Sequence, residues 1–131
     1  MKKILVSALF LAAGVTAANA ADWVELGSDQ NTTMYVDADR IKYTNKALQQ
    51  RNAWVKVKYN RPDGPYKMGD YTLANQVIDC KNTKFSVSTI ISYNAKGQMT
   101  QQAPMSKEWM DIPPDSIFEY VAGAVCSYPH I

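Results

Sequence analysis

The sequence predicts a mainly β fold of the α+β class, in which one antiparallel sheet carries a single helix near the C-terminus. Short runs rich in β-branched and aromatic residues recur between turn signals, and this pattern is typical of antiparallel strands joined by short connections. Only one segment, close to the C-terminus, combines a helix start signal with apolar residues at helical spacing. No repeat or long linker divides the chain, so we expect one domain at 21–131.

The first twenty residues read as an export signal that is cleaved off. Lys2 and Lys3 precede an apolar run at 4–15, and Ala18-Asn19-Ala20 supplies the small residues of a cleavage site. The run is shorter than the roughly 20 residues that span a bilayer, and no cysteine follows it for lipid attachment. We therefore expect an exported protein, either periplasmic or secreted to the outer surface.

The N-terminal half of the mature chain predicts three strands. Segments 23–26 and 34–37 flank a polar turn at 27–31. Segment 52–59 is the clearest half-buried strand, because its residues alternate between two faces. One face carries Ala53, Val55, Val57 and Tyr59, and the other carries Trp54, Lys56 and Lys58. We expect Trp54 to lie under the helix, with the lysine stems covering it and their ammonium groups in water.

The second half predicts three further strands. Two prolines and a glycine at 61–65 deny this segment ladder hydrogen bonds and make it a loop. Segments 71–80 and 84–93 read as longer strands, and the second places alternate residues on one face: Phe85, Val87, Thr89, Ile91 and Tyr93. Gly97 suits the left-handed position of a hairpin turn, which predicts a returning strand at 98–102.

Segment 116–126 predicts the only helix. Pro113 and Pro114 prevent an earlier start, and Ser116 with Glu119 has the spacing of a capping box. An apolar stripe follows at helical spacing: Ile117, Val121, Ala124 and Val125. We expect this stripe to pack on the sheet.

The two cysteines, Cys80 and Cys126, end a predicted strand and the predicted helix. In an oxidising compartment such a pair is most simply a disulfide, which here ties the helix to the sheet. A metal site that combines both thiols with His130 is the alternative, but it lacks a fourth ligand. There is no C-x-x-C motif for redox chemistry, and we expect neither a metal nor a cofactor.

No pattern predicts catalysis, and we expect a protein that is not an enzyme. His130 is the only histidine, and its place next to the chain end favours a solvated tail over a catalytic base. Asp37 and Asp39 have the spacing of turn-capping residues rather than of a glycosidase pair. A nucleophile, its base and an orienting partner cannot be assembled from the sequence.

Charge is unevenly distributed, although the chain after Ala20 holds twelve basic and twelve acidic residues. Segment 22–39 has five acids and no base, whereas segment 40–67 has eight bases and one acid, a net charge of +7. These segments either neutralise each other as adjacent strands or leave a basic surface for an acidic partner. A neutral exported chain is a poor candidate for nucleic-acid binding. The candidate binding residues are the eight bases: Arg40, Lys42, Lys46, Arg51, Lys56, Lys58, Arg61 and Lys67.

A series of landmarks runs along almost the whole mature chain: Trp23, Tyr35-Val36-Asp37 with Ile41, Trp54-Val55-Lys56, Asp79-Cys80, segment 93–97, Trp109, segment 112–116 and Cys126. In this order they resemble the surface-adhesin protein E family of small exported bacterial proteins. The resemblance implies one antiparallel sheet of about six strands, with a C-terminal helix tied down by a disulfide. It also implies an adhesin that binds host matrix and plasma proteins such as vitronectin, laminin and plasminogen.

Two functions follow from these observations. The first is an exported, adhesin-like binding protein whose basic residues contact host proteins or acidic glycans. The second is a soluble periplasmic accessory or inhibitor protein without a host ligand, with Tyr66 and the proline-glycine loop as its contact surface. The missing lipid-attachment cysteine departs from the lipid-anchored adhesin of the family and bears on the choice between them.

Overall fold

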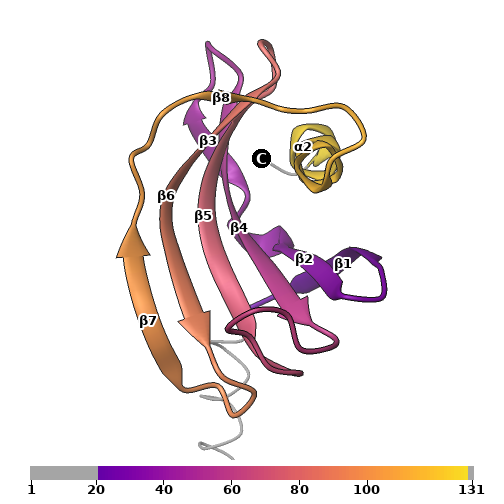
Figure 1. Ribbon diagram of the computed structural model, residues 1–131. Helices are drawn as coiled ribbons and strands as arrows, with labels where there is room; N and C mark the ends of the chain where they lie inside the picture. Colours follow the sequence, from indigo (N-terminus) through magenta and orange to yellow (C-terminus); the bar gives the residue numbers. More distant parts are fainter. Residues whose placement is uncertain (1–20, 130–131) are drawn as a thin grey trace, which may run out of the picture.

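A computed structural model describes residues 21–129, so the expected export signal at 1–20 and His130 lie outside the described residues. An eight-stranded antiparallel sheet curves around one helix (Figure 1). The mainly β fold with its C-terminal helix is therefore confirmed. Within residues 21–129, no helix is long and apolar enough to cross a membrane.

Six strands form the continuous path of the sheet, in the order β1-β2-β4-β5-β6-β7. They are β1 (Trp23–Ser28), β2 (Thr32–Asp37), β4 (Gln50–Tyr59), β5 (Tyr71–Asp79), β6 (Lys84–Tyr93) and β7 (Met99–Pro104). Two short strands, β3 (Lys42–Asn45) and β8 (Met110–Asp111), pair with β4 and β6. The 3-10 helix η1 (Ala38–Arg40) links β2 to β3, and the helix α2 is Ile117–Ser127.

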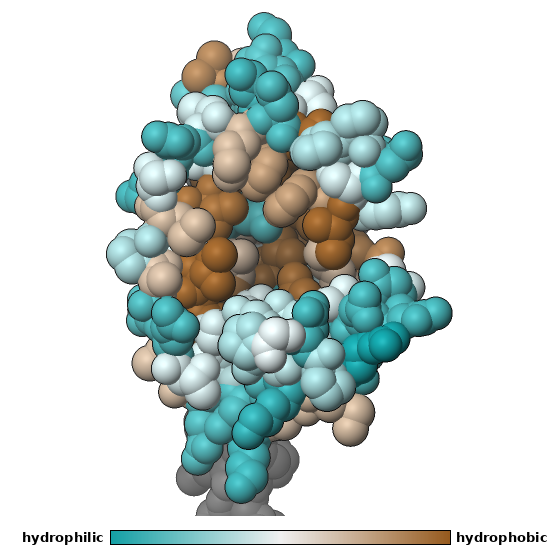
Figure 2. Space-filling view, viewed as in Figure 1, coloured by the Kyte–Doolittle hydropathy of each residue, from teal (hydrophilic) through white to brown (hydrophobic). Residues whose placement is uncertain are grey.

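The sheet has a concave face, which packs on α2, and an opposite convex face. The buried core joins Val36, Val55 and Ile78 of the sheet to Val121 and Val125 of the helix. Since Val55 pairs with Val36 on one side and with Ala74 on the other, one row of side chains crosses three strands beneath α2. Figure 2, viewed as in Figure 1, shows an apolar hollow in this side of the molecule.

The helix packs through Val121 and Val125, as the sequence predicts, but Ile117 and Ala124 of the predicted stripe are not part of the core. Ser116 is the N-cap, as expected, and its hydroxyl accepts a hydrogen bond from the backbone N–H of Glu119. The helix residues in the core or packed against it are Phe118, Val121, Ala122, Val125 and Cys126, which lie at i, i+3, i+4, i+7 and i+8. Ile117 is 40% exposed, because it lies one position away from this stripe on the helix surface.

A β-bulge in β6 overturns the predicted alternation of that strand. Gln76 of β5 pairs with Val87 and its neighbour Asn75 pairs with Thr89, so Ser88 is an extra residue in the ladder. The Ser88 hydroxyl donates to the Asn75 side-chain oxygen at 3.0 Å. Because the extra residue shifts the alternation by one, Phe85 and Val87 face the core, whereas Thr89, Ile91 and Tyr93 lie on the convex face.

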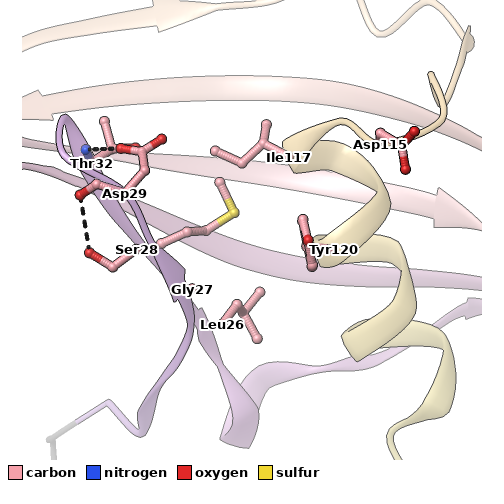
Figure 3. Close-up of a pocket in the computed structure, with 9 residues that line it drawn as sticks. Leu26, Gly27, Ser28, Asp29, Thr32, Asp115, Ile117 and Tyr120 are labelled. Carbon is pink, nitrogen blue, oxygen red and sulfur yellow. Dashed lines mark hydrogen bonds between the residues drawn. The ribbon is translucent and has the colours of Figure 1, made fainter.

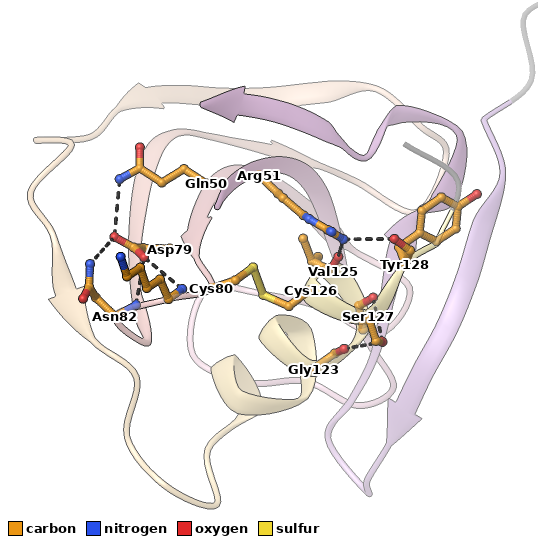
Figure 4. The surroundings of a disulfide bond; sticks show 12 residues. Gln50, Arg51, Asp79, Cys80, Asn82, Gly123, Val125, Cys126, Ser127 and Tyr128 are labelled. Atoms are coloured by element: carbon orange, nitrogen blue, oxygen red, sulfur yellow. Dashed lines mark hydrogen bonds between the residues drawn. A yellow bond between two sulfur atoms is a disulfide. The ribbon is translucent and has the colours of Figure 1, made fainter. Parts of the chain in front are cut away.

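The two cysteines form the disulfide Cys80–Cys126, which links the end of β5 to the end of α2 (Figure 4). The expected disulfide is confirmed, and the alternative use of these thiols as metal ligands is wrong. In the range 21–129, no group of three or more histidine, cysteine, aspartate or glutamate side chains is arranged to hold a metal ion.

Asp79, next to the disulfide, accepts several hydrogen bonds that stabilise its charged form. Its carboxylate accepts backbone N–H bonds from Asn82 at 2.9 Å and Lys81 at 3.1 Å, and side-chain bonds from Asn82 and Gln50 (Figure 4). These bonds, led by the backbone N–H of Asn82, lower the pKa of Asp79 below its ordinary 3.8, because they stabilise the charged form.

We predict that Asp79→Asn loses stability mainly at neutral pH. A carboxylate with a lowered pKa stabilises the fold above its unfolded pKa, and this contribution disappears as the pH falls through the lower, folded pKa. The stability gap between the protein and Asp79→Asn should therefore narrow between pH 6 and pH values below 3.8. Urea unfolding at several pH values measures the gap, and a constant gap contradicts the prediction.

Candidate binding surface

Three of the lysines on the convex face of the sheet have no ion-pair partner among the described residues. Lys56 and Lys58 follow the alternation of β4 and point away from the buried Val55. Lys42 of β3 pairs with Asn52, which has the same parity as Lys56, so Lys42 lies on the same face. We call Lys42, Lys56 and Lys58 the lysine face.

Lys56 lies within a row of aromatic rings that crosses the sheet. Its Nζ is 4.6 Å from the ring centroid of Tyr71, 5.4 Å from that of Tyr35 and 5.7 Å from that of Trp23. Tyr71 in turn stacks on Tyr93, with 4.9 Å between the ring centroids. One face of each ring is therefore turned toward the Lys56 ammonium or toward a neighbouring ring.

The surroundings of Lys56 favour contact with an anion. Partial burial lowers the pKa of Lys56, and the nearby positive charge of Lys58 lowers it further. Both effects destabilise the charged ammonium, and a carboxylate or sulfate at this place would counteract them. The lysine face therefore carries charge that an acidic partner can compensate.

Among the described residues, no ion pair compensates the positive charge of the lysine face. Within residues 21–129 there are two, Arg40–Asp37 at 2.5 Å and Lys84–Asp111 at 3.6 Å, and neither involves the lysine face. The acidic and basic segments of the sequence do lie side by side as β2 and β4. Nevertheless, Arg40–Asp37 is the one ion pair between these two segments within residues 21–129. The other carboxylate oxygen of Asp37 caps η1, as the sequence predicts.

The other exposed bases do not extend this surface into one patch. Lys46 lies in the β3–β4 turn, 5.7 Å from the ring of Tyr43. Arg61 and Lys67 lie in the β4–β5 loop, where Arg61 donates to the Gln30 side chain. These two groups flank opposite ends of β4, a strand of 10 residues, or roughly 30 Å. The +7 segment is therefore spread along a strand.

Arg51 is a structural residue. It is only 8% exposed, and its guanidinium group donates to the backbone oxygens of Val125 at 2.8 Å and Tyr128 at 3.0 Å (Figure 4). It also donates to the Tyr43 hydroxyl at 2.9 Å. A positive charge at the C-terminal end of a helix satisfies free carbonyls and complements the helix dipole. We therefore leave Arg51 out of the binding surface.

Trp54 lies on the convex face, and the prediction that it packs under the helix is wrong. It pairs with Asn75 and has the parity of Lys56, whereas the smaller Ala53 and Val55 form the floor under α2. Trp54 is partly exposed, and its side chain is not packed against the core. The convex face thus carries large apolar side chains beside its lysines.

Tyr66 belongs to a compact β4–β5 loop. Its ring stacks on that of Tyr59, with 4.2 Å between the centroids, and its backbone exchanges two hydrogen bonds with Asp63. One face of the Tyr66 ring is therefore covered by Tyr59. Other residues of the loop, including Pro65 and Lys67, are exposed.

Comparison with known proteins identifies the family. The surface-adhesin protein E family matches residues 23–127, from the first residue of β1 to the last residue of α2. The resemblance carried by the sequence landmarks is thereby confirmed. No curated protein matches the chain significantly.

Proposed function

We propose, because the chain belongs to the surface-adhesin protein E family, that it binds an acidic partner through the lysine face. The family supports an adhesin-like, exported or surface protein and favours a non-enzymatic role. The partners that fit the proposal are host matrix or plasma proteins, namely vitronectin, laminin or plasminogen, or acidic glycans. Their carboxylate or sulfate groups would pair with the lysine ammonium groups.

One observation supports this proposal more than any other. Three ammonium groups lie on one face of the sheet without an ion-pair partner among the described residues. The helix packs on the opposite, concave face, as the core shows. Charged surfaces of this kind accelerate and orient the encounter with a partner of opposite charge.

The variant Lys42→Glu with Lys58→Glu should abolish most of the binding to immobilised heparin, vitronectin or laminin. Both side chains are exposed and neither takes part in an ion pair within residues 21–129, so their reversal should leave the fold intact. Binding by the unaltered protein should weaken as salt rises from 50 to 500 mM, because exposed charges are screened over roughly 10 Å at 0.1 M. Surface plasmon resonance measures both effects.

Lys96→Glu with Lys107→Glu is the matched control, because it changes the net charge equally at two exposed residues outside the lysine face. Retained binding in this control, together with loss in the first variant, assigns the contact to the lysine face. Equal loss of binding in both variants would show that the effect depends on net charge and not on the lysine face. Unchanged binding in the first variant would contradict the proposal.

The compartment is a second part of the proposal. We propose that the protein is displayed on the outer surface, as the adhesin role requires, and the alternative is a soluble periplasmic accessory or inhibitor protein. Protease added to intact cells should degrade a displayed protein. Full protection on intact cells, with degradation only after the outer membrane is opened, would support the periplasmic alternative.

A further inference from the structure

A groove lies on the concave side of the molecule, between the β1–β2 hairpin and the start of α2 (Figure 3). Its volume is about 410 Å³, within the usual range of ligand-binding pockets. Nine residues line it: Leu26, Gly27, Ser28, Asp29, Thr32, Met34, Asp115, Ile117 and Tyr120. Since Met34 belongs to the buried core and the lysine face lies on the convex side, the two surfaces are separate.

The walls of the groove are apolar and partly exposed. Ile117 and Tyr120 are 40% and 69% exposed, and they lie one helical turn apart on α2, so they present one continuous surface. Leu26 faces them from β1 (Figure 3). The buried Met34 also lines the groove. Apolar side chains that gather on a surface in this way are typical of interaction sites.

The rim of the groove is acidic. Asp29 and Asp115 stand on opposite sides of it (Figure 3), and none of the nine lining residues is basic. The backbone N–H groups of Thr32 and Asn31 donate to Asp29 Oδ1, each at 2.7 Å, and they lower the pKa of this carboxyl. Asp115 takes part in no ion pair among residues 21–129. Both carboxylates are available to a cation.

We propose that this groove binds an extended, cationic and amphipathic peptide segment of a partner protein, with an apolar side chain between α2 and β1 and a lysine or arginine at the rim. Charge complementarity selects this occupant. An anionic lipid, a fatty acid or an acidic glycan would bring negative charge toward Asp29 and Asp115. A cation without an apolar part would leave the wall of Ile117 and Tyr120 in water.

A six-residue peptide that alternates lysine and isoleucine is the probe. Its titration into the ¹⁵N-labelled protein should shift the amide signals of residues 26–34 and 115–120. Fluorescence anisotropy with the labelled peptide gives the Kd. Asp115→Asn should raise the Kd about 3- to 5-fold, the upper range for one exposed charge pair. Tyr120→Ala should raise it about 5-fold or more, as expected for an aromatic anchor.

Both variants should fold, because Asp115 has a positive φ of 58°, which asparagine tolerates well, and Tyr120 is largely exposed. Glu108→Gln and Met99→Ala are the controls, since they alter an exposed acid and an exposed apolar residue outside the groove. The Kd should not change in either control, nor in Lys42→Glu with Lys58→Glu.

Three results would overturn the proposal. The first is equal binding of a peptide that alternates glutamate and isoleucine, or of one that alternates lysine and serine. The second is an unchanged Kd in Asp115→Asn and Tyr120→Ala. The third is a concentration-dependent dimer in which a second copy protects the groove signals. Heparin binding by Asp115→Asn should equal that of the unaltered protein, so this inference and the proposed function can fail separately.

Discussion

Cys80→Ser should melt about 15 °C below the unaltered protein. The disulfide closes a loop with a sequence separation of 46 residues, which restricts the unfolded chain and stabilises the fold by roughly 4 kcal/mol in the chain-entropy model. For a domain of this size, 1 kcal/mol corresponds to a shift of about 4 °C. Differential scanning calorimetry under non-reducing conditions measures the change.

The bond, rather than the substituted side chain, should account for this loss. Cys126→Ser and the double variant should melt at the same temperature as Cys80→Ser. After reduction with dithiothreitol, the unaltered protein should also melt at this temperature. Reduction should have no effect on any of the variants. A melting temperature that stays constant on reduction would show that the link between β5 and α2 contributes nothing.

Arg51→Ala should destabilise the fold by about 3 kcal/mol, because it leaves buried polar groups without their donor. The guanidinium group bonds the last turn of α2 to β3 through Val125, Tyr128 and the Tyr43 hydroxyl, and its carbon lies 4.8 Å from the Tyr43 ring centroid. A lysine cannot reach all three acceptors from its single nitrogen, so Arg51→Lys should recover only part of the stability. Chemical denaturation measures both variants.

Arg61→Ala is the matched control for Arg51, since it removes an exposed guanidinium group with one bond to a Gln30 side chain. Its free energy of unfolding should change by less than about 0.5 kcal/mol. At temperatures where Arg51→Ala is fully folded, this variant should bind heparin as tightly as the unaltered protein does. Weaker heparin binding by folded Arg51→Ala would show that Arg51 is part of the binding surface.

The sequence predicts the strands of this fold better than it predicts their orientation. The alternation of β4 separates two faces correctly, but both faces contain large apolar residues, so periodicity alone does not tell which one is buried. The expectation that Trp54 lies under the helix fails for this reason. The structure instead places Ala53 and Val55 under the helix, where small side chains let α2 approach the sheet closely.

Features that depend on distant residues lie beyond sequence patterns. The bulge at Ser88 follows from pairing with Asn75 and Gln76, and the sequence of β6 alone does not predict it. β3 and β8 have four and two residues, too few to show a period. The groove joins the β1–β2 hairpin to α2, elements separated by most of the chain.

The binding residues illustrate the same limit. A charge run along the chain points to β4, and the proposed lysine face is part of that prediction. It gives no information about burial, which removes Arg51, or about the length of the strand, which separates Lys46 from Arg61 and Lys67. The disulfide was predictable because the chain has two cysteines and the expected export to an oxidising compartment makes their pairing the simplest outcome.

The extra residue in β6 shows how shape and composition can be encoded independently in one strand. Deleting Ser88 would place Val87 directly before Thr89, and Val87, Thr89 and Ile90 would keep the faces that they have now. The hydropathy of both surfaces would be preserved, but the local bend that a bulge imposes would be lost. Ser88 therefore contributes to the shape of the sheet that α2 packs against, and it does so without changing which of these side chains each face carries.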